Sequence, residues 1–394
     1  MGKRSIKSYP RKEVKIIMKL SCHKLQLLKI INTVQKAVSS KSIMPILECV
    51  KIDAEANGNI TVTGNNLDLC VEYNDTCEVT EAGSIAISSK MFGEIIRRLP
   101  DDEVKISVNE ENNVTTIKCG KAEFNIQGLS GFEYPSVPEV SENYSFSISQ
   151  KALRKMIKKT IFAVSQNEAR KPILTGSLFE IDTGVLSVVS TDGYRLALCK
   201  ETINSSLENK KFVIPGLTLR EVFKVLEDDE EKMVNIIVSD RHAMFNFENY
   251  KVVTRLLEGE YINYKPVLMT PNSIVVVANT GLLSESLERA SLLINDDISA
   301  KAEKVPVRLS IIMDKIEITC MTGKGKVHDI VDVSVNGEDI EIGFNYKYLL
   351  EALRACEEEE VKMEFSNPRS SCFIRSAAGD DSYTYMILPV RLYN

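Results

Sequence analysis

The chain has 394 residues, of which 44% are hydrophobic and 26% are charged, so it is neither a fibrous nor a disordered protein. It contains no run of about 18 apolar residues, which excludes an ordinary membrane-spanning helix. The net charge of −6 argues against a nucleic-acid partner only if the charge is spread evenly, and it is not.

The stretch 1–17 is basic, with a single acid, Glu13. The basic positions are Lys3, Arg4, Lys7, Arg11, Lys12 and Lys15. No apolar run of signal-peptide length follows them, so secretion is not indicated. We expect residues 1–17 to be a disordered extension and the folded protein to start at Met18.

Nine cysteines are scattered along the chain, and no two have the CxxC spacing. An odd number of cysteines in a long chain is typical of reduced, partly buried thiols in the cytoplasm. Neither a disulfide framework nor a zinc site is therefore expected.

Helical spacing of apolar residues recurs three times, over residues 22–39, 149–164 and 279–294. The predicted N-caps are Ser21, Ser149 and Asn279, residue types that favour this position. Successive caps are nearly equally spaced along the sequence. One structural unit is therefore repeated about every 128 residues.

A second type of helix recurs at the same interval, over residues 88–99, 217–226 and 345–354, each time after a short apolar strand. Further strands with turn signals fill the intervals. The sequence thus predicts three copies of an α+β domain, each with two helices and a mostly antiparallel sheet. The predicted bounds are 18–144, 145–270 and 271–394.

The positive charge is concentrated on these helices. Counted over residues 22–39, 88–99, 149–164, 217–227, 279–294 and 345–356, they carry sixteen Lys and Arg but six Asp and Glu, a net charge of +10, which leaves −16 for the rest of the chain. The densest cluster lies in residues 149–164, which contain five basic residues and no acid. One face of the molecule would attract phosphates, and without a base-reading motif any DNA contact would be non-specific.

A predicted hairpin joins the strand 185–189 to the strand 196–199. Asp192 and Gly193 supply turn chemistry, because Asp can bond its own backbone and Gly adopts positive φ freely. Tyr194 and Arg195 follow, and these residue types are frequent in binding hot spots. Taken alone, the stretch favours an ordinary hairpin with a solvated arginine over a binding site.

No catalytic constellation is found. The three histidines, His23, His242 and His328, have no partner at metal or triad spacing. The stretch 323–326 predicts a hairpin turn, and the acidic runs 228–231 and 357–360 predict solvated loops. No metal and no cofactor are expected.

Several motifs taken together resemble one family. They are Thr191-Asp192-Gly193-Tyr194-Arg195-Leu196, Gly343-Phe344-Asn345-Tyr346-Lys347-Tyr348 and Leu388-Pro389-Val390-Arg391-Leu392, supported by Met44-Pro45-Ile46-Leu47 and Phe179-Glu180. From Met18 to Leu392 the chain resembles the bacterial DNA polymerase III beta subunit, the sliding clamp.

The resemblance implies three clamp domains and a head-to-tail homodimer that forms a six-domain ring around duplex DNA. Such a ring is not an enzyme. It slides without reading sequence, and it confers processivity by tethering the polymerase III alpha subunit, the clamp loader and other replication and repair proteins that carry a clamp-binding motif. The expected location is the bacterial cytoplasm, on the nucleoid during replication, without a membrane.

The resemblance also implies site residues. The partner-peptide pocket matches Leu174, Thr191, Gly193, Tyr194, Arg195, Leu196, Ile262, Val267, Asn345, Tyr348, Leu388, Pro389, Val390, Arg391 and Leu392. Leu174, Leu196, Val267 and Val390 would form its apolar floor, and Tyr194, Arg195, Tyr348 and Arg391 would form its rim.

Residues expected to face DNA are Lys24, Lys41, Lys90, Arg97, Lys151, Arg154, Lys155, Lys158, Lys159, Arg220, Lys224 and Lys347. The dimer contact matches Phe124 and Ile126 against Leu292 and Leu293. The chain departs from the family at Ile262, where Pro is usual, and in having Tyr393 and Asn394 after Leu392.

Two alternatives are an enzyme acting on phosphorylated substrates and an acidic scaffold without a DNA role. The absence of any acid–base pair or phosphate-loop motif argues against the enzyme. Only the middle copy of the repeat carries the Tyr-Arg pair, which favours a docking pocket over an ordinary turn. The corresponding turns near residues 64–66 and 321–323 lack it.

Overall fold

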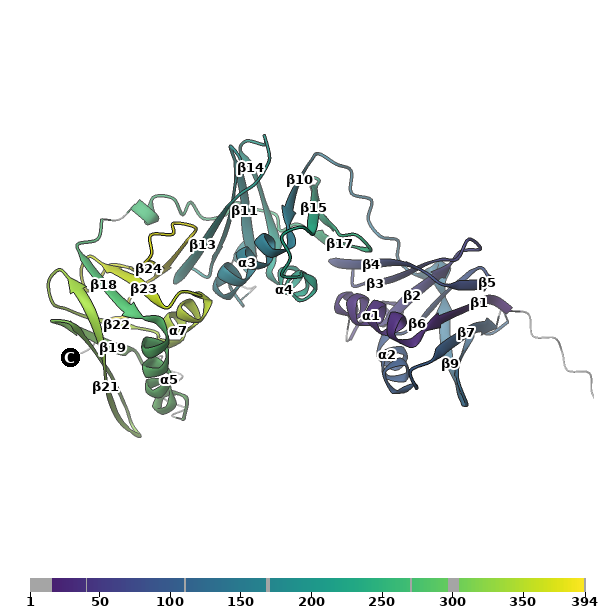
Figure 1. Cartoon of the computed structure of the whole chain (residues 1–394), viewed down its shortest axis with the longest axis horizontal. Coiled ribbons are helices and arrows are strands. Elements are labelled where there is room, and N and C mark those ends of the chain that lie inside the picture. Colours follow the sequence, from purple (N-terminus) through teal and green to yellow (C-terminus); the bar gives the residue numbers. More distant parts are fainter. Residues whose placement is uncertain are drawn as a thin grey trace, which may run out of the picture. The chain divides into compact units, whose positions relative to one another are not determined.

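The computed structural model describes residues 16–39, 41–109, 111–167, 171–269, 271–296 and 305–392 (Figure 1). Residues 1–15, for which a disordered extension was predicted, and Tyr393–Asn394 lie outside the described residues. Contacts divide the chain into two compact units, Met1–Ser145 with Asn235–Arg255 and Phe146–Val234 with Leu256–Asn394.

The first unit is an antiparallel sheet with two helices. Its elements are β1 (Ile16–His23), α1 (Lys24–Val34), η1 (Gln35–Ala37), η2 (Pro45–Glu48), β2 (Cys49–Ala54), β3 (Asn59–Asn65), β4 (Leu69–Thr76), β5 (Glu78–Glu81), β6 (Gly83–Ser88), α2 (Ser89–Arg98), β7 (Glu103–Asn109), β8 (Val114–Cys119), β9 (Ala122–Ser130), η3 (Gly131–Glu133), β16 (His242–Asn246) and β17 (Tyr250–Arg255). Within it the strands run in the order β16-β17-β4-β3-β2-β6-β9-β8-β7-β1-β5. β10 (Tyr144–Ser149) and β15 (Met233–Val238) each contribute residues to both units.

In its described residues, the second unit holds four α-helices and a sheet in the order β14-β11-β12-β13-β25-β24-β23-β18-β21-β20-β19-β22. Its elements are α3 (Gln150–Thr160), η4 (Ile161–Ala163), η5 (Pro172–Thr175), β11 (Gly176–Asp182), β12 (Val185–Thr191), β13 (Arg195–Thr202), β14 (Lys210–Pro215), α4 (Gly216–Val225), η6 (Val267–Met269), β18 (Ile274–Asn279), α5 (Thr280–Asp296), β19 (Val307–Ile312), β20 (Lys315–Thr322), β21 (Gly325–Asn336), β22 (Ile340–Phe344), α7 (Tyr346–Ala355), β23 (Glu360–Phe365), β24 (Cys372–Ser376) and β25 (Tyr383–Ile387).

The predicted repeat is confirmed in the strand register. β2 pairs with β6, β11 with β14 and β19 with β22, and the second strand of each pair leads into a helix, α2, α4 or α7. The pair Cys49↔Ser88 in the first copy corresponds to Gly176↔Pro215 in the second. Both partners are displaced by the same interval along the sequence, so the two pairs have the same register.

Most predicted helix starts are confirmed by capping contacts. The Ser149 hydroxyl accepts a hydrogen bond from the Ala152 amide at 3.2 Å, and the Asn279 side chain accepts one from the Leu282 amide at 3.0 Å. The first helix was predicted to start at Cys22 behind a Ser21 cap, and this was wrong. Ser21 is still paired in β1, and the cap is His23, whose Nδ1 accepts from the Leu25 amide.

Strand β1 also begins earlier than predicted, because the backbone of Ile16 already pairs with Asn109. Ile16 and Ile17 therefore belong to the sheet and not to the basic extension. Met18, the predicted start of the folded protein, is fully buried.

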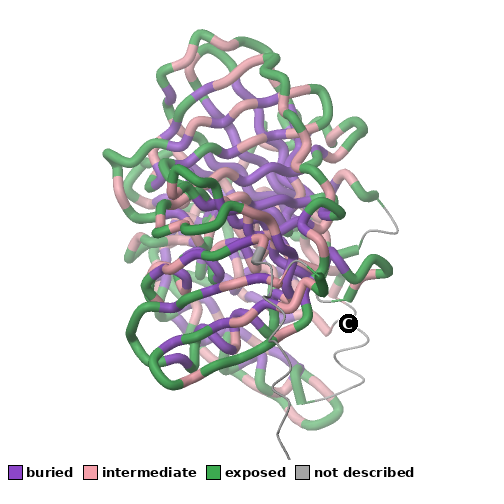
Figure 2. Tube along the Cα trace, turned by 90° about the vertical axis from the view of Figure 1, so that its right-hand side faces the viewer, coloured by how far each residue is buried: buried purple, intermediate pink, exposed green. Residues whose placement is uncertain are grey.

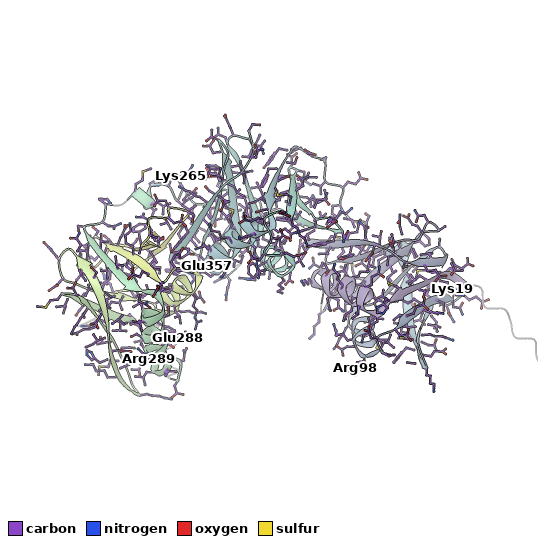
Figure 3. All side chains as sticks on the ribbon, in the orientation of Figure 1. Lys19, Arg98, Lys265, Glu288, Arg289 and Glu357 are labelled. Carbon is purple, nitrogen blue, oxygen red and sulfur yellow. The ribbon has the colours of Figure 1, made fainter. Side chains whose placement is uncertain are left out.

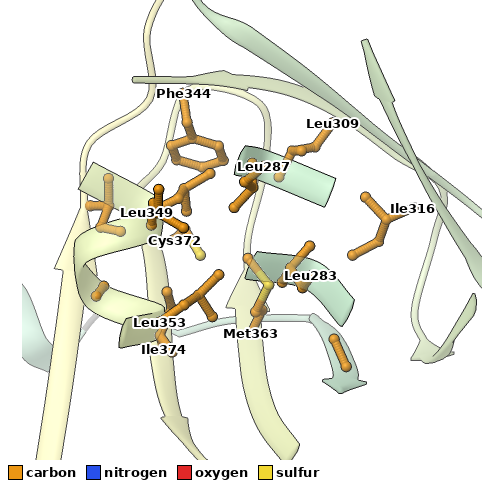
Figure 4. Packing of buried hydrophobic residues seen from close by; sticks show 14 of the residues in the cluster. Leu283, Leu287, Leu309, Ile316, Phe344, Leu349, Leu353, Met363, Cys372 and Ile374 are labelled. Atoms are coloured by element: carbon orange, nitrogen blue, oxygen red, sulfur yellow. The ribbon is translucent and has the colours of Figure 1, made fainter. Parts of the chain in front are cut away.

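A large hydrophobic cluster lies in the second unit, between its sheet and helices α5 and α7 (Figure 4). Leu283 and Leu287 of α5 and Leu349 and Leu353 of α7 are each at most 1% exposed. Burying one such side chain contributes about 2 kcal/mol. Elsewhere, buried positions follow the strands and exposed positions gather in the turns (Figure 2).

All nine cysteines are free, and seven are buried, as predicted for reduced thiols. Burial raises the pKa of Cys70 and of Cys199 to about 12, so both are neutral thiols at physiological pH. Within the described ranges, no group of three or more His, Cys, Asp or Glu residues could hold a metal ion. No helix in the part of the chain that the structure describes is long and apolar enough to span a membrane.

Candidate docking pocket and DNA-facing helices

The predicted hairpin is formed by β12 and β13, which pair from Val185↔Thr202 to Thr191↔Leu196. At its tip, one carboxylate oxygen of Asp192 accepts hydrogen bonds from the Tyr194 amide at 2.9 Å and from the Arg195 amide at 3.1 Å. Gly193 has a φ of +89°. The turn is therefore built as the Asp-Gly pair predicted.

Arg195 is buried, with 5% of the residue exposed, and does not form the rim predicted for it. Its guanidinium donates to the Asp192 carboxylate at 3.1 Å, to the Phe162 carbonyl at 2.6 Å and to the Glu351 carboxylate. A buried guanidinium requires such partners. Arg195 thus joins the hairpin tip to η4 and α7.

Beside the hairpin tip lies a cavity of about 700 Å³, which we call the docking cavity. Its lining residues are Val164, Ser165, Gln166, Asn167, Lys171, Leu174, Asp192, Gly193, Tyr194, Arg195, Ile262, Lys347 and Tyr348. Tyr194 is 46% exposed. The volume is in the range of sites for small molecules and short peptide segments.

Six residues of the predicted pocket line this cavity, namely Leu174, Gly193, Tyr194, Arg195, Ile262 and Tyr348. Thr191 and Leu196 lie beneath it. The Thr191 hydroxyl donates to the Arg195 carbonyl at 2.6 Å, and Leu196 packs in a core cluster with Leu178 and Tyr264.

The residues of the predicted apolar floor lie differently with respect to this cavity. Leu174 lines the docking cavity, whereas Leu196, Val267 and Val390 are not among its described lining residues. Asn345 is the N-cap of α7, where its side chain accepts from the Lys347 amide.

The C-terminal segment Leu388–Leu392 crosses from the hairpin to β22. The Leu388 amide donates to the Tyr194 carbonyl at 2.9 Å, and the Val390 amide donates to the Gly343 carbonyl at 2.8 Å. Arg391 and Leu392 line a separate cavity of about 430 Å³. Leu388 and Val390 thus lie beside the docking cavity, and the segment continues past it to the second one.

Sequence reasoning missed several lining residues of the docking cavity. Val164–Asn167 and Lys171 form part of its wall, and Lys347, which was expected to face DNA, lines it as well. The internal repeat could have identified Lys171, because this residue directly precedes a turn that recurs in the first copy of the repeat. Residues 45–48 and 172–175 form equivalent 3-10 turns, η2 and η5, each beginning with a proline.

Helix α3 carries the densest basic cluster, but each of its cations has an internal partner. Lys151 lies 2.7 Å from Glu230, Lys155 lies 3.6 Å from Glu201, and Lys158 lies 2.6 Å from Glu357. Arg154 donates to the carbonyls of Phe223 and Leu226.

Lys159 is 1% exposed, and its ammonium lies 3.9 Å from the centroid of the Tyr383 ring and 3.5 Å from Glu358. It cannot reach a phosphate without leaving these partners, so Lys159 does not face DNA in this structure. The predicted stripe of DNA-facing cations is corrected at this position.

The acidic runs were predicted to be solvated loops, and residues 228–231 and 357–359 are indeed loops whose side chains are mostly exposed. Several of these side chains also form ion pairs. Glu230, Glu357 and Glu358 all pair with lysines of α3. The hydrogen bond from Lys158 lowers the pKa of Glu357 below its usual value. Glu357, which is labelled in Figure 3, lies just after the end of α7.

The remaining basic residues of the prediction differ in exposure. Lys24 donates to the Leu99 carbonyl at 2.6 Å, Arg97 pairs with Glu94, and Lys224 pairs with Glu221. Arg220 is half-buried, whereas Lys41, Lys90 and Lys347 are exposed.

The four residues predicted at the dimer contact carry apolar surface. Leu292 is 68% exposed and Phe124 is 39% exposed, while Ile126 and Leu293 are half-buried. Exposed side chains of this kind on α5 and β9 are typical of an interface and not of a core.

Family models match three consecutive segments of the chain. They describe the N-terminal domain of the DNA polymerase III beta subunit over residues 18–138, its central domain over 147–263 and its C-terminal domain over 265–391. The beta sliding clamps of Halalkalibacterium halodurans and Staphylococcus epidermidis are each 34% identical to the chain. The matches cover 92% of this chain and 97% and 96% of those relatives.

Solved structures agree. The DNA polymerase sliding clamp of Bacillus subtilis is 32% identical with a TM-score of 0.89, and a putative DNA polymerase III beta subunit from Eubacterium rectale is 38% identical with a TM-score of 0.88. A sliding clamp from Pseudomonas aeruginosa, solved bound to griselimycin, is 27% identical with a TM-score of 0.87. Each match covers 95% of this chain and 100% of the other.

Three consecutive clamp domains define a replication factor that acts by holding DNA and a polymerase together and not by catalysis. Within that class, the chain belongs to the bacterial beta sliding clamp family, the beta subunit of DNA polymerase III. It is a DNA sliding clamp that confers processivity.

Proposed function

We propose that the docking cavity receives short peptide segments of the polymerase III alpha subunit, the clamp loader and other clamp-binding proteins. The observation that carries this assignment is the cavity of about 700 Å³ beside the exposed Tyr194. Leu174 and Ile262 supply apolar wall, and Lys347 supplies a cation at the edge. Leu388–Leu392 borders the site through its hydrogen bond to Tyr194.

The roles of the other predicted residues follow from the same proposal. Two chains would associate head to tail, with Phe124 and Ile126 of one against Leu292 and Leu293 of the other, and the ring would have six domains, with bounds near 144 and 270. A heterologous contact of this kind closes into a ring when its rotation fits. The protein would act in the bacterial cytoplasm, on the nucleoid during replication.

Duplex DNA would pass through the ring beside the exposed cations of the helices. Phosphate contacts position a duplex without reading its sequence, so the ring could slide. Retention would then depend on the closed topology and would tolerate weak contacts. The enzyme and scaffold alternatives are not favoured by the site.

Topological retention is tested by loading the clamp onto nicked circular DNA and then cutting the circle. We expect the protein to remain on the circle and to leave the linear product. Equal retention on both would contradict encirclement. Light scattering should give a mass near twice 44.1 kDa, and Leu292→Asp should shift it toward one chain.

The docking cavity is tested with griselimycin as the probe, because a clamp relative was solved with it. Calorimetry should show binding to the wild type, weakened by Tyr194→Ala and unchanged by Phe132→Ala. Phe132 is the matched aromatic control, since it is 91% exposed and belongs to the other unit. Unchanged binding to Tyr194→Ala would show that the probe binds elsewhere.

A further inference from the structure

A second groove, in the first unit, is not used by the function described above. It has a volume of about 540 Å³ and lies between strands β2, β3, β4 and β6 and the segment that follows η3. Its lining residues are Lys51, Asp53, Ala54, Glu55, Thr61, Thr63, Glu72, Gly83, Ser84, Phe132, Tyr134, Pro135, Ser136 and Val137. Three acids and one lysine line it, and Phe132 beside it is 91% exposed.

The internal repeat shows what fills the equivalent place in the second unit. The pair Asp53↔Ser84 in β2 and β6 corresponds to Glu180↔Lys211 in β11 and β14. The hydroxyl of Tyr134 donates to the Cys49 carbonyl, as that of Tyr261 does to the Gly176 carbonyl. All of these correspondences share one offset along the sequence, the offset that relates Cys49 to Gly176.

In the second unit, the chain itself covers this place. The Tyr264 hydroxyl donates to the Glu180 carboxylate at 2.6 Å, and the Lys265 ammonium donates to it at 2.8 Å. Glu180 is 6% exposed as a result. An aromatic residue next to a cation is therefore a demonstrated occupant of this site.

Among the described residues of the first unit, nothing equivalent to that cover is found. At the same offset, Val137 and Pro138 stand where the second unit has Tyr264 and Lys265. Asp53 is held from the sheet itself, by Ser84 at 2.6 Å and Lys51 at 2.9 Å. Glu72 pairs with Lys251 at 2.9 Å, and Glu55 accepts from the Asn57 amide group. The groove remains open above these groups.

The aromatic and basic residue types that cover the equivalent place in the second unit occur at the start of the chain. Residues 1–15 contain six basic residues and one acid, and Tyr9 is followed by Arg11 and Lys12. The next residues enter β1 beside the groove. A Cβ built on Gly83, which lines the groove, would lie 2.0 Å from the carbonyl oxygen of Ile17.

The segment before β1 is long enough to reach the groove. An extended chain spans at most about 3.5 Å per residue, so Lys12 can lie about 14 Å and Tyr9 about 25 Å from Ile16. A tether of this length holds the segment near the groove at an effective concentration on the order of millimolar. Weak contacts are therefore enough for docking.

We propose that residues 1–15 of this chain dock in the groove of the first unit, with Tyr9, Arg11 and Lys12 covering Asp53 as Tyr264 and Lys265 cover Glu180. The docked segment covers Phe132 and neutralises the groove acids. It does so within one chain and independently of the docking cavity.

The chain has no tryptophan, so a single introduced one reports on the groove. In the full-length Phe132→Trp protein, we expect blue-shifted emission and slow acrylamide quenching, because the segment shields the indole. Deleting residues 2–15 should shift the emission to the red and speed the quenching. A control Met321→Trp, at a 76% exposed position in the second unit, should not respond to the deletion.

Charge and sequence are then tested separately. Arg11→Glu with Lys12→Glu should reproduce the deletion, and so should Glu55→Lys in the groove. A synthetic peptide of residues 1–15 at millimolar concentration should restore the shielding to the truncated protein, and a peptide with both glutamate substitutions should not.

Identical emission from the full-length and truncated Phe132→Trp proteins would overturn the proposal. Equal restoration by the two peptides would overturn the role of Arg11 and Lys12. Shielding that grows with protein concentration would show that the segment docks on a second copy, and this would overturn docking within one chain.

Discussion

The guanidinium of Arg195 lies 4.5 Å from the centroid of the Tyr348 ring and 5.4 Å from that of Phe162. Tyr348 belongs to α7 and lines the docking cavity, and Phe162 belongs to η4, just before the wall segment Val164–Asn167. A desolvated cation–π contact is worth about 2 kcal/mol. One buried cation thus connects the hairpin tip, η4 and α7 at the walls of the cavity.

We expect Arg195→Ala to destabilise the second unit by about 3 kcal/mol, because it leaves Asp192 and Glu351 without their shared cation. Urea denaturation of the whole protein measures this loss. Griselimycin binding should fall as well, since the cavity walls lose their common anchor.

Two variants separate anchoring from charge. Arg195→Lys keeps the charge but loses the planar five-donor fork that reaches the three acceptors, so its stability should fall between those of the wild type and Arg195→Ala. Tyr194→Ala should change the stability by about 0.5 kcal/mol or less, because the ring is largely exposed. Wild-type stability in Arg195→Ala would contradict the anchoring role.

A pH-dependent contribution should come from Glu180. Burial alone would raise its pKa, but hydrogen bonds from Lys265, Tyr264 and Lys211 outweigh burial and hold the pKa below its usual value. A carboxyl whose folded pKa is depressed stabilises the protein above its unfolded pKa, and this contribution is lost as the pH falls through the folded value. Glu180→Gln should therefore cost about 2 kcal/mol at neutral pH.

The measurement for Glu180 is the difference in unfolding free energy between wild type and Glu180→Gln across the acid range. The difference should be constant above the unfolded pKa, near 4.5, and should shrink below it. A difference that grows with acidity would contradict a depressed pKa for Glu180.

The repeat and the hairpin could be predicted because their causes are local. Capping residues such as Ser149, and the Asp-Gly turn at Asp192, act over a few residues, and the repeat returns at a constant offset. The Ser21 cap failed because pairing of β1 with β7 extends the strand to His23, and sheet pairing is not a local signal.

The burial of Arg195 could not be predicted, since its partner Glu351 is 156 residues away along the chain. The same holds for Lys158, whose partner Glu357 is 199 residues away. A count of charges along the sequence includes both Lys158 and Glu357, but it cannot show that the two side chains are in contact. The basic composition of α3 was therefore predicted correctly. The ion pairs that occupy its cations, and so limit their availability to DNA phosphates, were not predicted.

Two glycines of the motifs that resemble the clamp family should respond differently to alanine. At Gly343, an added Cβ would lie 2.6 Å from Leu392 Cδ2 and 2.8 Å from the Val390 carbonyl oxygen. We expect Gly343→Ala to displace the segment Leu388–Leu392 and to weaken griselimycin binding. Limited proteolysis of the C-terminal segment, which should become faster, measures the displacement.

Gly193 is the matched control for that variant. Nothing lies within 4 Å of a Cβ built there, so Gly193→Ala meets only the strain of positive φ, about 1–2 kcal/mol. Proteolysis of the C-terminal segment should stay at the wild-type rate. If Gly343→Ala also left it unchanged, the contact with Leu392 would not be what holds the segment.

The acidic partners of α3 should weaken the contact with DNA. Lys158 is held by Glu357 at 2.6 Å, so a phosphate must compete with that carboxylate. Glu357→Gln should free the ammonium, tighten the binding of a short DNA duplex and steepen the fall of log K with log salt by about 0.9, the value for one further phosphate contact. Fluorescence anisotropy over a series of salt concentrations measures both effects.

Glu341→Gln is the control, because Glu341 pairs with Arg308 on neighbouring strands and not on a helix. An unchanged slope in Glu357→Gln would mean that Lys158 does not reach the phosphates even when it is released.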